Sequence, residues 1–401
     1  MTVDAAARPS AALRRARAAV AALFLTNGTL FANLVPRLPQ IKADLALDNS
    51  AYGLIVAAFP AGAIAAGLAA AALIRRFGSA RMAVAGTILT GLGLLAAVLA
   101  PTPAALAALL FLAGATDSVT DVAQNAHGLR VQRRYGRSII NSLHAVWSIG
   151  AVLGGAMAAG AIAVGLSRGV HLGIAAALCT TIALVAQRFC LPGRDEDATS
   201  GATPRETGRS AIGARTLLIL GALVLIAMGG TLVEDAGSSW AALYLSVDLG
   251  APAALAATGF IALVAAQFVG RLIGDRLVDR FGQRAVARSG GLLVAAGMGL
   301  ALAFPTVPGT IAGFAAAGFG VSTLVPAAMH EADELPGLRA GTGLTLVSWL
   351  MRLSFLLSPP LVGLLADAAG LRTGLLVVPA AGVVVVLLAG VLQPRRRTGR
   401  A

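Results

Sequence analysis

The sequence predicts an all-α integral membrane protein of about twelve transmembrane helices, arranged as two pseudo-symmetric bundles of six. Three observations lead to this fold class. Charged residues make up only 12% of the chain and hydrophobic residues 57%. Apolar runs long enough to cross a bilayer recur along the chain, and a polar stretch near its middle divides them into two similar sets.

The composition argues against a soluble protein. Soluble domains carry about 25% charged residues, so 12% in a chain of 401 residues leaves too few charges to cover a surface exposed to water. The 48 glycines suit transmembrane packing, because small residues let helix backbones approach each other. The net charge of +13 does not indicate a nucleic-acid partner, because the arginines lie between the apolar runs in a biased pattern. The expected partner is the lipid bilayer.

Twelve apolar runs have roughly the 20-residue length that a helix needs to span a membrane. They lie near residues 18–36, 51–73, 82–100, 104–126, 142–164, 170–188, 216–240, 251–273, 289–305, 308–329, 343–366 and 373–392. The first run lacks the cleavage pattern of a signal peptide, so we expect it to remain as a transmembrane helix.

The distribution of basic residues predicts the orientation of the chain. With both termini on the inner side, 26 arginines fall in the inner segments, and Arg271 is counted among them. The outer segments hold only Arg37, Lys42, Arg168 and Arg372. Short cytoplasmic loops are enriched in arginine and lysine. We therefore predict a multi-pass protein of the plasma (cytoplasmic) membrane with both termini in the cytoplasm.

A polar stretch at residues 192–214 has the proline, glycine, serine and charge content of a flexible linker. It separates two sets of six spans, which implies two domains. The predicted segments are a cytoplasmic N-terminal segment (1–17), an N-terminal six-helix bundle (18–191), a cytoplasmic linker (192–214), a C-terminal six-helix bundle (215–393) and a cytoplasmic basic tail (394–401).

The two halves share a short internal repeat. Residues 76–78 and 280–282 both read Arg-Phe-Gly and lie 204 positions apart, each just after the second span of its half. Gly93 and Gly297 have the same offset. This repeat falls where a duplicated six-helix unit predicts it. Secondary transporters are commonly built from such repeats, with the substrate site between them near mid-membrane.

The run GDRLVDRFGQR, residues 274–284, carries a longer motif. Together with the two six-helix halves and the central linker, it resembles the major facilitator superfamily. That family has an Asp-Arg-x-Gly-x-Arg turn between the second and third helix of each half. The resemblance implies a cytoplasmic gate motif formed in the second half by Asp279, Arg280, Gly282 and Arg284.

The first half departs from this pattern. Arg75 occupies the place of the acid and is followed by Arg76 and Gly78. A carboxylate at a helix end can pair with the positive N-terminus of another helix, an interaction of ~0.3–1 kcal/mol. Asp279 can form such a pair with the start of the fifth helix, near Ser142, whereas Arg75 cannot. The alternative reading is that these arginine-rich turns only anchor the topology.

Four short strings resemble the branch of that superfamily that contains the fucose–proton symporter and its bacterial relatives. They are RLPQIK (37–42), DVAQNAHG (121–128), HAVWSIG (144–150) and EDAGSSW (234–240). In that branch, an acidic residue of the fourth helix precedes an asparagine by four positions and carries the proton. The resemblance therefore implies proton transfer at Asp121, which is followed by Asn125.

Few ionisable residues lie within the predicted spans. A charge at the bilayer centre costs ~3 kcal/mol or more, so each of them needs a partner or a water-filled cavity. The third, sixth, ninth and twelfth spans have none in their apolar cores, so we expect these four to face lipid; the second, eighth and tenth also have none. The charged spans then line a shared interior. They contain Asp117 and Asp121 (fourth span), His144 (fifth), Glu234 and Asp235 (seventh) and Arg352 (eleventh).

Asp117, Asp121 and Asn125 recur every four residues and so share one helix face. His144 enters the fifth span at a similar depth, which makes a pair with Asp121 reasonable. Desolvation favours a neutral carboxyl and a cationic neighbour favours an ionised one, so a group held between the two can exchange protons. Asp121 is the first candidate for proton coupling, with His144 and Asp117 beside it. The alternatives are a permanent counter-charge for Asp121 and a packing role for His144.

Arg352 lies near the middle of the eleventh span. An unpaired arginine is costly there, so the expected partner is Glu234, Asp235 or Asp117. The alternative is that Arg352 binds an anionic or polyhydroxyl substrate. The candidates for the wall of a substrate cavity are Asn27, Gln124, Asn125, Trp147, Glu234, Asp235 and Arg352. Trp240 is a further candidate for the cavity wall, and the alternative, which we favour, is an interfacial belt position near the outer surface.

Motifs for other chemistry are absent from the sequence. It contains no GxxxxGK[ST] phosphate loop and no serine in a nucleophile elbow. The four histidines, His127, His144, His171 and His330, show no metal-ligand spacing. We expect no enzymatic activity, no cofactor and no bound metal.

These observations predict a secondary active transporter that moves a small solute by alternating access and is coupled to protons. We expect a monomer whose partners are a small-molecule substrate and H⁺. Two alternatives stay open. One is a proton-antiport exporter of drugs or metabolites, and the other is a membrane sensor or enzyme that keeps the fold without transporting.

Overall fold

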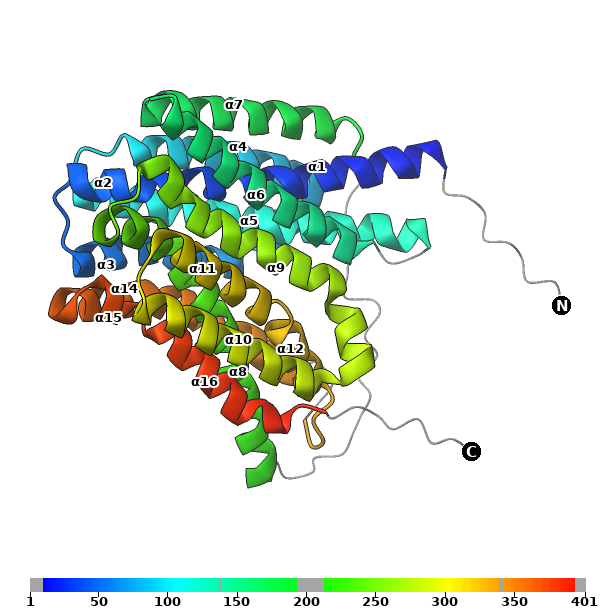
Figure 1. Ribbon diagram of the computed structural model, residues 1–401. Coiled ribbons are helices and arrows are strands. Elements are labelled where there is room, and N and C mark those ends of the chain that lie inside the picture. Colours follow the sequence, from blue (N-terminus) through cyan, green and yellow to red (C-terminus); the bar gives the residue numbers. More distant parts are fainter. Residues whose placement is uncertain (1–9, 137–138, 193–212, 339–341, 394–401) are drawn as a thin grey trace, which may run out of the picture.

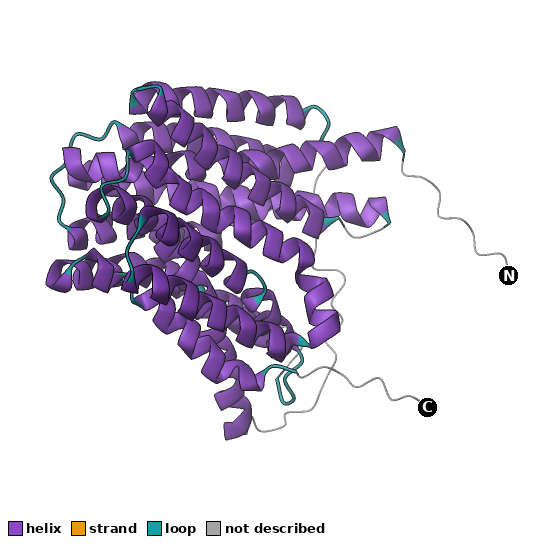
Figure 2. Cartoon of the chain, viewed as in Figure 1, coloured by secondary structure: helices purple, strands orange, loops and turns teal. Residues whose placement is uncertain are grey.

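The computed structural model describes residues 10–136, 139–192, 213–338 and 342–393. Within these ranges the chain consists of helices joined by loops and has no strand (Figure 2). In this described part of the chain, twelve helical segments are long and apolar enough to cross a membrane. The predicted fold class and the predicted number of spans are therefore confirmed.

Six spans form the N-terminal half. The first is α1 (Ala11–Leu34), which continues through the short helix η1 (Val35–Arg37) into α2 (Leu38–Asp44). The others are α3 (Asn49–Phe77), α4 (Ser79–Val98), α5 (Pro103–Tyr135), α6 (Ile140–Ala163) and α7 (Arg168–Gln187).

Six further spans form the C-terminal half. They are α8 (Ala214–Leu243) with η2 (Tyr244–Asp248), α9 (Ala253–Phe281), α10 (Gln283–Ala303), α11 (Val307–Val321) with α12 (Leu324–Asp333), α13 (Thr342–Leu350) with α14 (Arg352–Ala369), and α15 (Leu371–Gly374) with α16 (Val377–Leu388) and η3 (Ala389–Val391). The tenth span is interrupted at Ser322 and Thr323, and the eleventh at Met351.

The first span starts earlier than expected. α1 begins at Ala11 rather than at residue 18, and the hydroxyl of Ser10 accepts a hydrogen bond from the amide of Leu13 at 3.3 Å. A serine at this position is a favourable helix N-cap, and the following alanines and arginines are good helix formers. Most of the expected linker (192–214) and the basic tail (394–401) lie outside the described residues.

The internal repeat extends to backbone geometry. α3 and α9 end at Gly78 and Gly282, whose φ angles are +88° and +86°. The amide of each glycine bonds the carbonyl four residues earlier, at 2.8 Å and 2.7 Å. In both turns the preceding arginine lies over the neighbouring phenylalanine ring, at 5.2 Å for Arg76 and 5.3 Å for Arg280. The two second-to-third-helix turns are therefore structural copies.

The two halves lie side by side, with most of α1–α7 in the upper part of Figure 1 and most of α8–α16 in the lower part. Because twelve is an even number of spans, α1 begins and η3 ends on the same side of the molecule. We call this side the terminal side and the opposite one the far side. The predicted cytoplasmic location of both termini refers to the terminal side and stays a prediction.

The halves contact each other through α3 against α14 and through α6 against α9. At the far side, the hydroxyl of Tyr52 on α3 donates to the carbonyl of Ser239 on α8 at 2.6 Å. Backbones also meet directly: a Cβ added at Gly53 would lie 2.3 Å from the carbonyl oxygen of Pro359, and one at Gly363 would lie 2.3 Å from that of Asn49. Only glycine permits such an approach. The far side is therefore closed.

The third, sixth, ninth and twelfth spans occupy the periphery. α4 and α7 pack against N-terminal helices, and α10 and α16 pack against C-terminal ones. Each exposes leucine side chains, among them Leu92, Leu178, Leu300 and Leu387. This arrangement agrees with the expectation that these four spans face lipid.

Candidate functional site

Asn27 links three helices of the N-terminal half. Its Oδ1 accepts hydrogen bonds from Nε1 of Trp147 at 2.8 Å and from Nε2 of Gln124 at 3.3 Å. Its Nδ2 donates to Oδ1 of Asp117 at 2.7 Å. α1 and α6 come close here because residue 28 is a glycine: a Cβ on Gly28 would lie 2.2 Å from the carbonyl oxygen of Trp147. Four of the predicted site residues thus form one network.

Asp121 lies one helical turn beyond Asp117 on α5. Its Oδ1 accepts hydrogen bonds from Nε2 of Gln124 at 3.3 Å and from Nδ2 of Asn125 at 3.1 Å. The Asp121 side chain is only partly buried. The predicted polar face of α5 therefore forms a continuous set of carboxylates and amides.

Two basic side chains lie near the carboxylate of Asp121, namely the imidazole of His144 on α6 and the guanidinium of Arg352 on α14. Both side chains are exposed, although they lie within spans. The ring of His144 meets that of Phe24 edge-on, with centroids 5.2 Å apart. Because Arg352 belongs to the C-terminal half, an acid of one half faces a cation of the other.

The prediction that Arg352 pairs with Glu234, Asp235 or Asp117 is wrong. Among the described residues, Arg352 forms no ion pair with a carboxylate. Glu234 interacts with Arg271 instead, and Asp117 accepts its hydrogen bond from Asn27. The exposure of Arg352 lets water solvate the guanidinium in place of an ion-pair partner.

Glu234 organises the C-terminal side of the interface. Its Oε2 accepts a hydrogen bond from Nε2 of the buried Gln267 at 2.7 Å. Nη2 of Arg271 lies 3.9 Å from the same oxygen. Nη1 of Arg271 donates to the hydroxyl of Ser148 on α6 at 3.4 Å. Arg271 therefore connects the two halves.

Arg271, which the sequence-based prediction counts among the arginines of the inner segments, contacts residues of both halves. Arg271 lies in α9, which continues to Phe281, about 15 Å further at 1.5 Å per residue. The eighth span is therefore not free of charge. Gln267 and Arg271 are four residues apart and share one helix face. This spacing of two polar residues in an apolar run is the sequence signal that could have placed Arg271 on the inward face of the helix.

Two residues of α8, Trp240 and Asp235, form no hydrogen bond with the polar residues around Asp121 and Glu234 in the described part of the chain. Trp240 is fully buried and packs edge-on against Tyr52, with ring centroids 4.8 Å apart. The expectation of an interfacial belt position is wrong, because the indole fills the contact between α8 and α3. Asp235 is 9% exposed, and its Oδ2 has no hydrogen-bond partner among the described residues.

Two residues of the predicted gate motif, Arg284 and Asp279, lie in different surroundings. Nε of Arg284 donates to the carbonyl of Leu392 at 3.0 Å, and its backbone amide donates to that of Gln393 at 3.1 Å. Arg284 therefore satisfies carbonyls at the end of the last helix of its own half. Asp279 is exposed near the end of α9. Its pairing with the helix that starts near Ser142 stays a prediction for a state in which the terminal side is closed.

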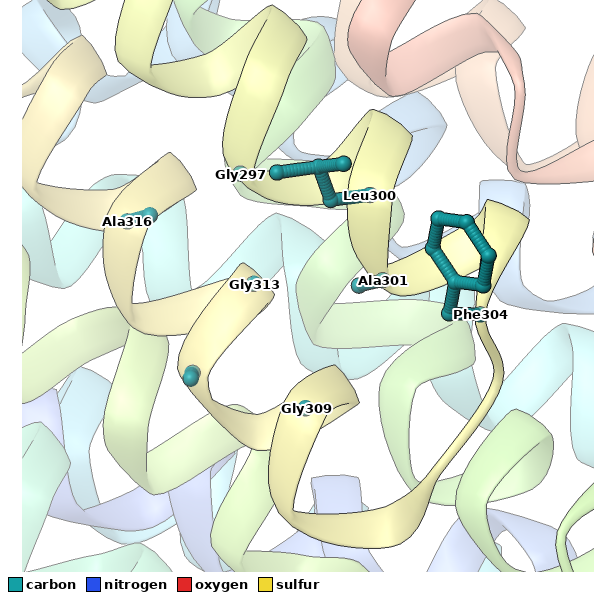
Figure 3. Close-up of a pocket in the computed structure, with 8 residues that line it drawn as sticks. Gly297, Leu300, Ala301, Phe304, Gly309, Gly313 and Ala316 are labelled. Carbon is teal, nitrogen blue, oxygen red and sulfur yellow. The ribbon is translucent and has the colours of Figure 1, made fainter.

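Figure 3 shows a hollow between α10 and α11 that is separate from this polar set. Its lining residues are Gly297, Leu300, Ala301, Phe304, Gly309, Ala312, Gly313 and Ala316. None of these has a polar side chain, so the hollow offers nothing to orient a polar solute. The residues that the structure describes contain no cluster of His, Cys, Asp or Glu suited to a metal ion.

Sequence comparison relates the whole chain to known membrane proteins. The profile of the Major Facilitator Superfamily matches residues 20–276 and 219–401. The chain is 31% identical over 385 residues to the membrane protein MosC of Rhizobium meliloti, covering 95% of this chain and 91% of that protein. It is also 31% identical over 376 residues to an uncharacterized transporter of Sinorhizobium fredii, covering 93% of this chain and 97% of that protein.

Solved structures share the architecture. A bacterial homolog of the human lysosomal transporter Spinster, in an inward-facing and unoccupied conformation, matches with a TM-score of 0.73 and 15% identity, covering 95% of this chain and 96% of that chain. The D-xylose-proton symporter matches with a TM-score of 0.69 and 17% identity, covering 94% and 96%. At these identities the likeness shows the fold alone.

Proposed function

The chain belongs to the Major Facilitator Superfamily, and we propose that it carries a small polar solute by alternating access, coupled to a proton on Asp121. It is a multi-pass membrane protein and a secondary transporter rather than an enzyme. The narrower resemblance to the fucose–proton symporter branch rests on four short strings, one of which begins at Asp121, and belongs to this proposal.

The observation that carries the proposal is the position of Asp121 between the halves. Amides of its own half hold one carboxylate oxygen, while Arg352 of the other half faces the group. An approaching cation favours the ionised carboxylate, and its withdrawal in a low-dielectric interior favours the protonated one. Rocking of the halves changes the distance between Asp121 and Arg352, so proton uptake is tied to the conformation.

The polar set also suits a small solute. It offers acceptors from Asp117, Asp121 and Glu234 and donors from Arg271 and Arg352. These groups come from both halves, so a bound solute can contact both at once. The closed far side means that such a solute exchanges with the terminal side in this conformation.

The first experiment identifies a solute. Purified protein is screened for thermal stabilisation by sugars, organic acids and common antibiotics, because a ligand that binds only the folded state raises its stability. The stabilising solute is then used in proteoliposomes with an imposed pH gradient. The direction of gradient-driven movement also separates import from export.

The decisive variant is Asp121→Asn. We expect it to keep solute exchange without a gradient and to lose accumulation driven by the proton gradient, because the amide cannot take up a proton. The control is Asp44→Asn, since Asp44 lies at the far side and pairs with Arg168 of its own half. Unchanged proton-driven accumulation in Asp121→Asn removes this residue from the coupling role.

A further inference from the structure

Three buried oxygens on α8 and α14, two helices that contact each other, have no hydrogen-bond partner among the described residues. They are Oδ2 of Asp235 and the hydroxyls of Ser354 and Ser358, and the three residues are 9%, 2% and 1% exposed. The carboxyl of Asp235 faces the hydroxyl of Ser358, although the two do not form a hydrogen bond of good geometry. Ser354 lies one turn before Ser358 and shares its helix face.

The two serines behave unlike others in this protein. A hydroxyl within a helix usually donates to the carbonyl three or four residues earlier. Ser148 does so to His144 at 3.2 Å, and Ser238 does so to Glu234 at 2.8 Å. Ser354 and Ser358 make no such bond. Their oxygens are therefore available to a ligand.

The surrounding backbone also supplies oxygen. The eleventh span is interrupted at Met351, and α14 contains Pro359 and Pro360. Proline has no amide hydrogen, so the carbonyls of Phe355 and Leu356, four residues earlier, lose their usual helical donor. In transporters, backbone carbonyls of interrupted helices coordinate coupling ions.

The negative charge of Asp235 has no cation beside it. Glu234, the residue before Asp235, accepts a hydrogen bond from Gln267 and forms an ion pair with Arg271. The hydroxyl of Tyr52, the nearest titratable group on α3, donates a hydrogen bond to the backbone carbonyl of Ser239. Arg352 forms no ion pair with a carboxylate in the described part of the chain. An isolated buried carboxylate costs several kcal/mol unless something neutralises it.

We propose that Asp235, Ser354 and Ser358 bind a sodium ion. The donors are all oxygens, which a hard cation prefers, and their single negative charge matches a monovalent ion. One cation satisfies all three unpartnered oxygens at once. The site lies beneath the closed contact of α3 with α14, so opening of the far side admits or releases the ion. This site is separate from the proton role of Asp121.

The test measures thermal unfolding of the purified full-length protein in detergent at constant ionic strength, with choline chloride replaced stepwise by NaCl or KCl. We expect a saturable, sodium-specific rise in the unfolding temperature, because the ion binds only the folded state. Ser358→Ala should raise the half-saturating sodium concentration at least about tenfold. Asp235→Asn and the double variant Ser354→Ala/Ser358→Ala should abolish the sodium effect.

Two controls define the site. Ser238→Ala removes a hydroxyl of α8 that bonds the backbone and should keep the full sodium response. Asp121→Asn should also keep it, which separates this proposal from proton coupling. If Asp235→Asn does not fold, the sodium response of the double variant Ser354→Ala/Ser358→Ala still tests the site. Equal effects of all three salts, as expected for a bridging water or a protonated Asp235, overturn the proposal. A sodium response that survives in the serine double variant overturns it as well.

Discussion

The carboxylate of Asp367, near the end of α14, accepts a hydrogen bond from the backbone amide of Ser50, in the first turn of α3, at 2.8 Å. The other carboxylate oxygen accepts one from the amide of Asn49 at 3.0 Å, and the hydroxyl of Ser50 bonds the carboxylate too. A carboxylate at a helix N-terminus satisfies unpaired amides and complements the helix dipole. Because α14 and α3 belong to different halves, this contact fastens the far side.

Asp367→Ala should loosen this contact. Loss of a capping side chain costs ~1 kcal/mol, which corresponds to about a fivefold shift toward states open at the far side. A cysteine placed at Ser239, which is 7% exposed behind the contact, reports the change as faster labelling by a membrane-impermeant maleimide. Asp44→Ala is the control, because Asp44 pairs with Arg168 within one half. Equal labelling rates in both variants contradict the assignment.

Gly53→Ala should prevent the far side from closing. The added Cβ would lie 2.3 Å from the carbonyl oxygen of Pro359, a backbone atom that cannot move alone. We expect transport to fall at least about tenfold, while the folded protein is still produced. Gly160→Ala is the matched control on α6, since nothing lies within 4 Å of a Cβ there. Full transport by Gly53→Ala shows that the backbones do not need to meet.

Arg271 and Glu234 should act as a unit. Each of Arg271→Gln and Glu234→Gln should reduce solute transport at least about tenfold, and the double variant should be no worse than either, because both singles break the same interaction. Initial rates in proteoliposomes provide the measurement. Arg276→Gln, an exposed arginine later in α9, should leave the rate unchanged. If the transport rate of the double variant falls by the product of the two single losses, Arg271 and Glu234 act independently and the prediction is wrong.

Gly78→Ala and Gly282→Ala should destabilise the protein by similar amounts. Their φ and ψ angles, +88° and 146° for Gly78 and +86° and 154° for Gly282, fall in a region open almost only to glycine, with a cost of ~1–3 kcal/mol for other residues. Unfolding in denaturant measures the loss. Gly221→Ala in α8, with no neighbour near its Cβ position, should be neutral or slightly stabilising. Clearly unequal losses of stability in the two variants contradict the conclusion that the two glycine turns are structural copies.

The native cysteines should not interfere with labelling. Burial raises the pKa of Cys190, just beyond the end of α7, to about 11. Because the thiolate is the reactive form, little of it exists at neutral pH. Maleimide modification of the wild-type chain should therefore be slow at pH 7 and accelerate as the pH rises toward 11. Rapid modification at pH 7 indicates a more open site and requires a cysteine-free background.

Much of the fold and part of the site follow from local sequence. Each span is an apolar run of sufficient length, and a helix satisfies its own backbone hydrogen bonds in lipid, so the number of spans needs no tertiary information. The face of Asp117, Asp121 and Asn125 follows from a four-residue spacing within one helix. The repeated glycine turns follow from identical tripeptides 204 positions apart.

The contacts between spans could not be predicted in the same way. Asp367 meets Ser50 across 317 positions, Arg271 reaches Ser148 across 123, and Arg352 faces Asp121 rather than the acids expected. Lipid is as apolar as the helix surfaces, so hydrophobicity does not decide which helices associate. The tertiary structure decides it through the fit of small residues such as Gly53 and Gly363, and that fit sets which polar groups meet.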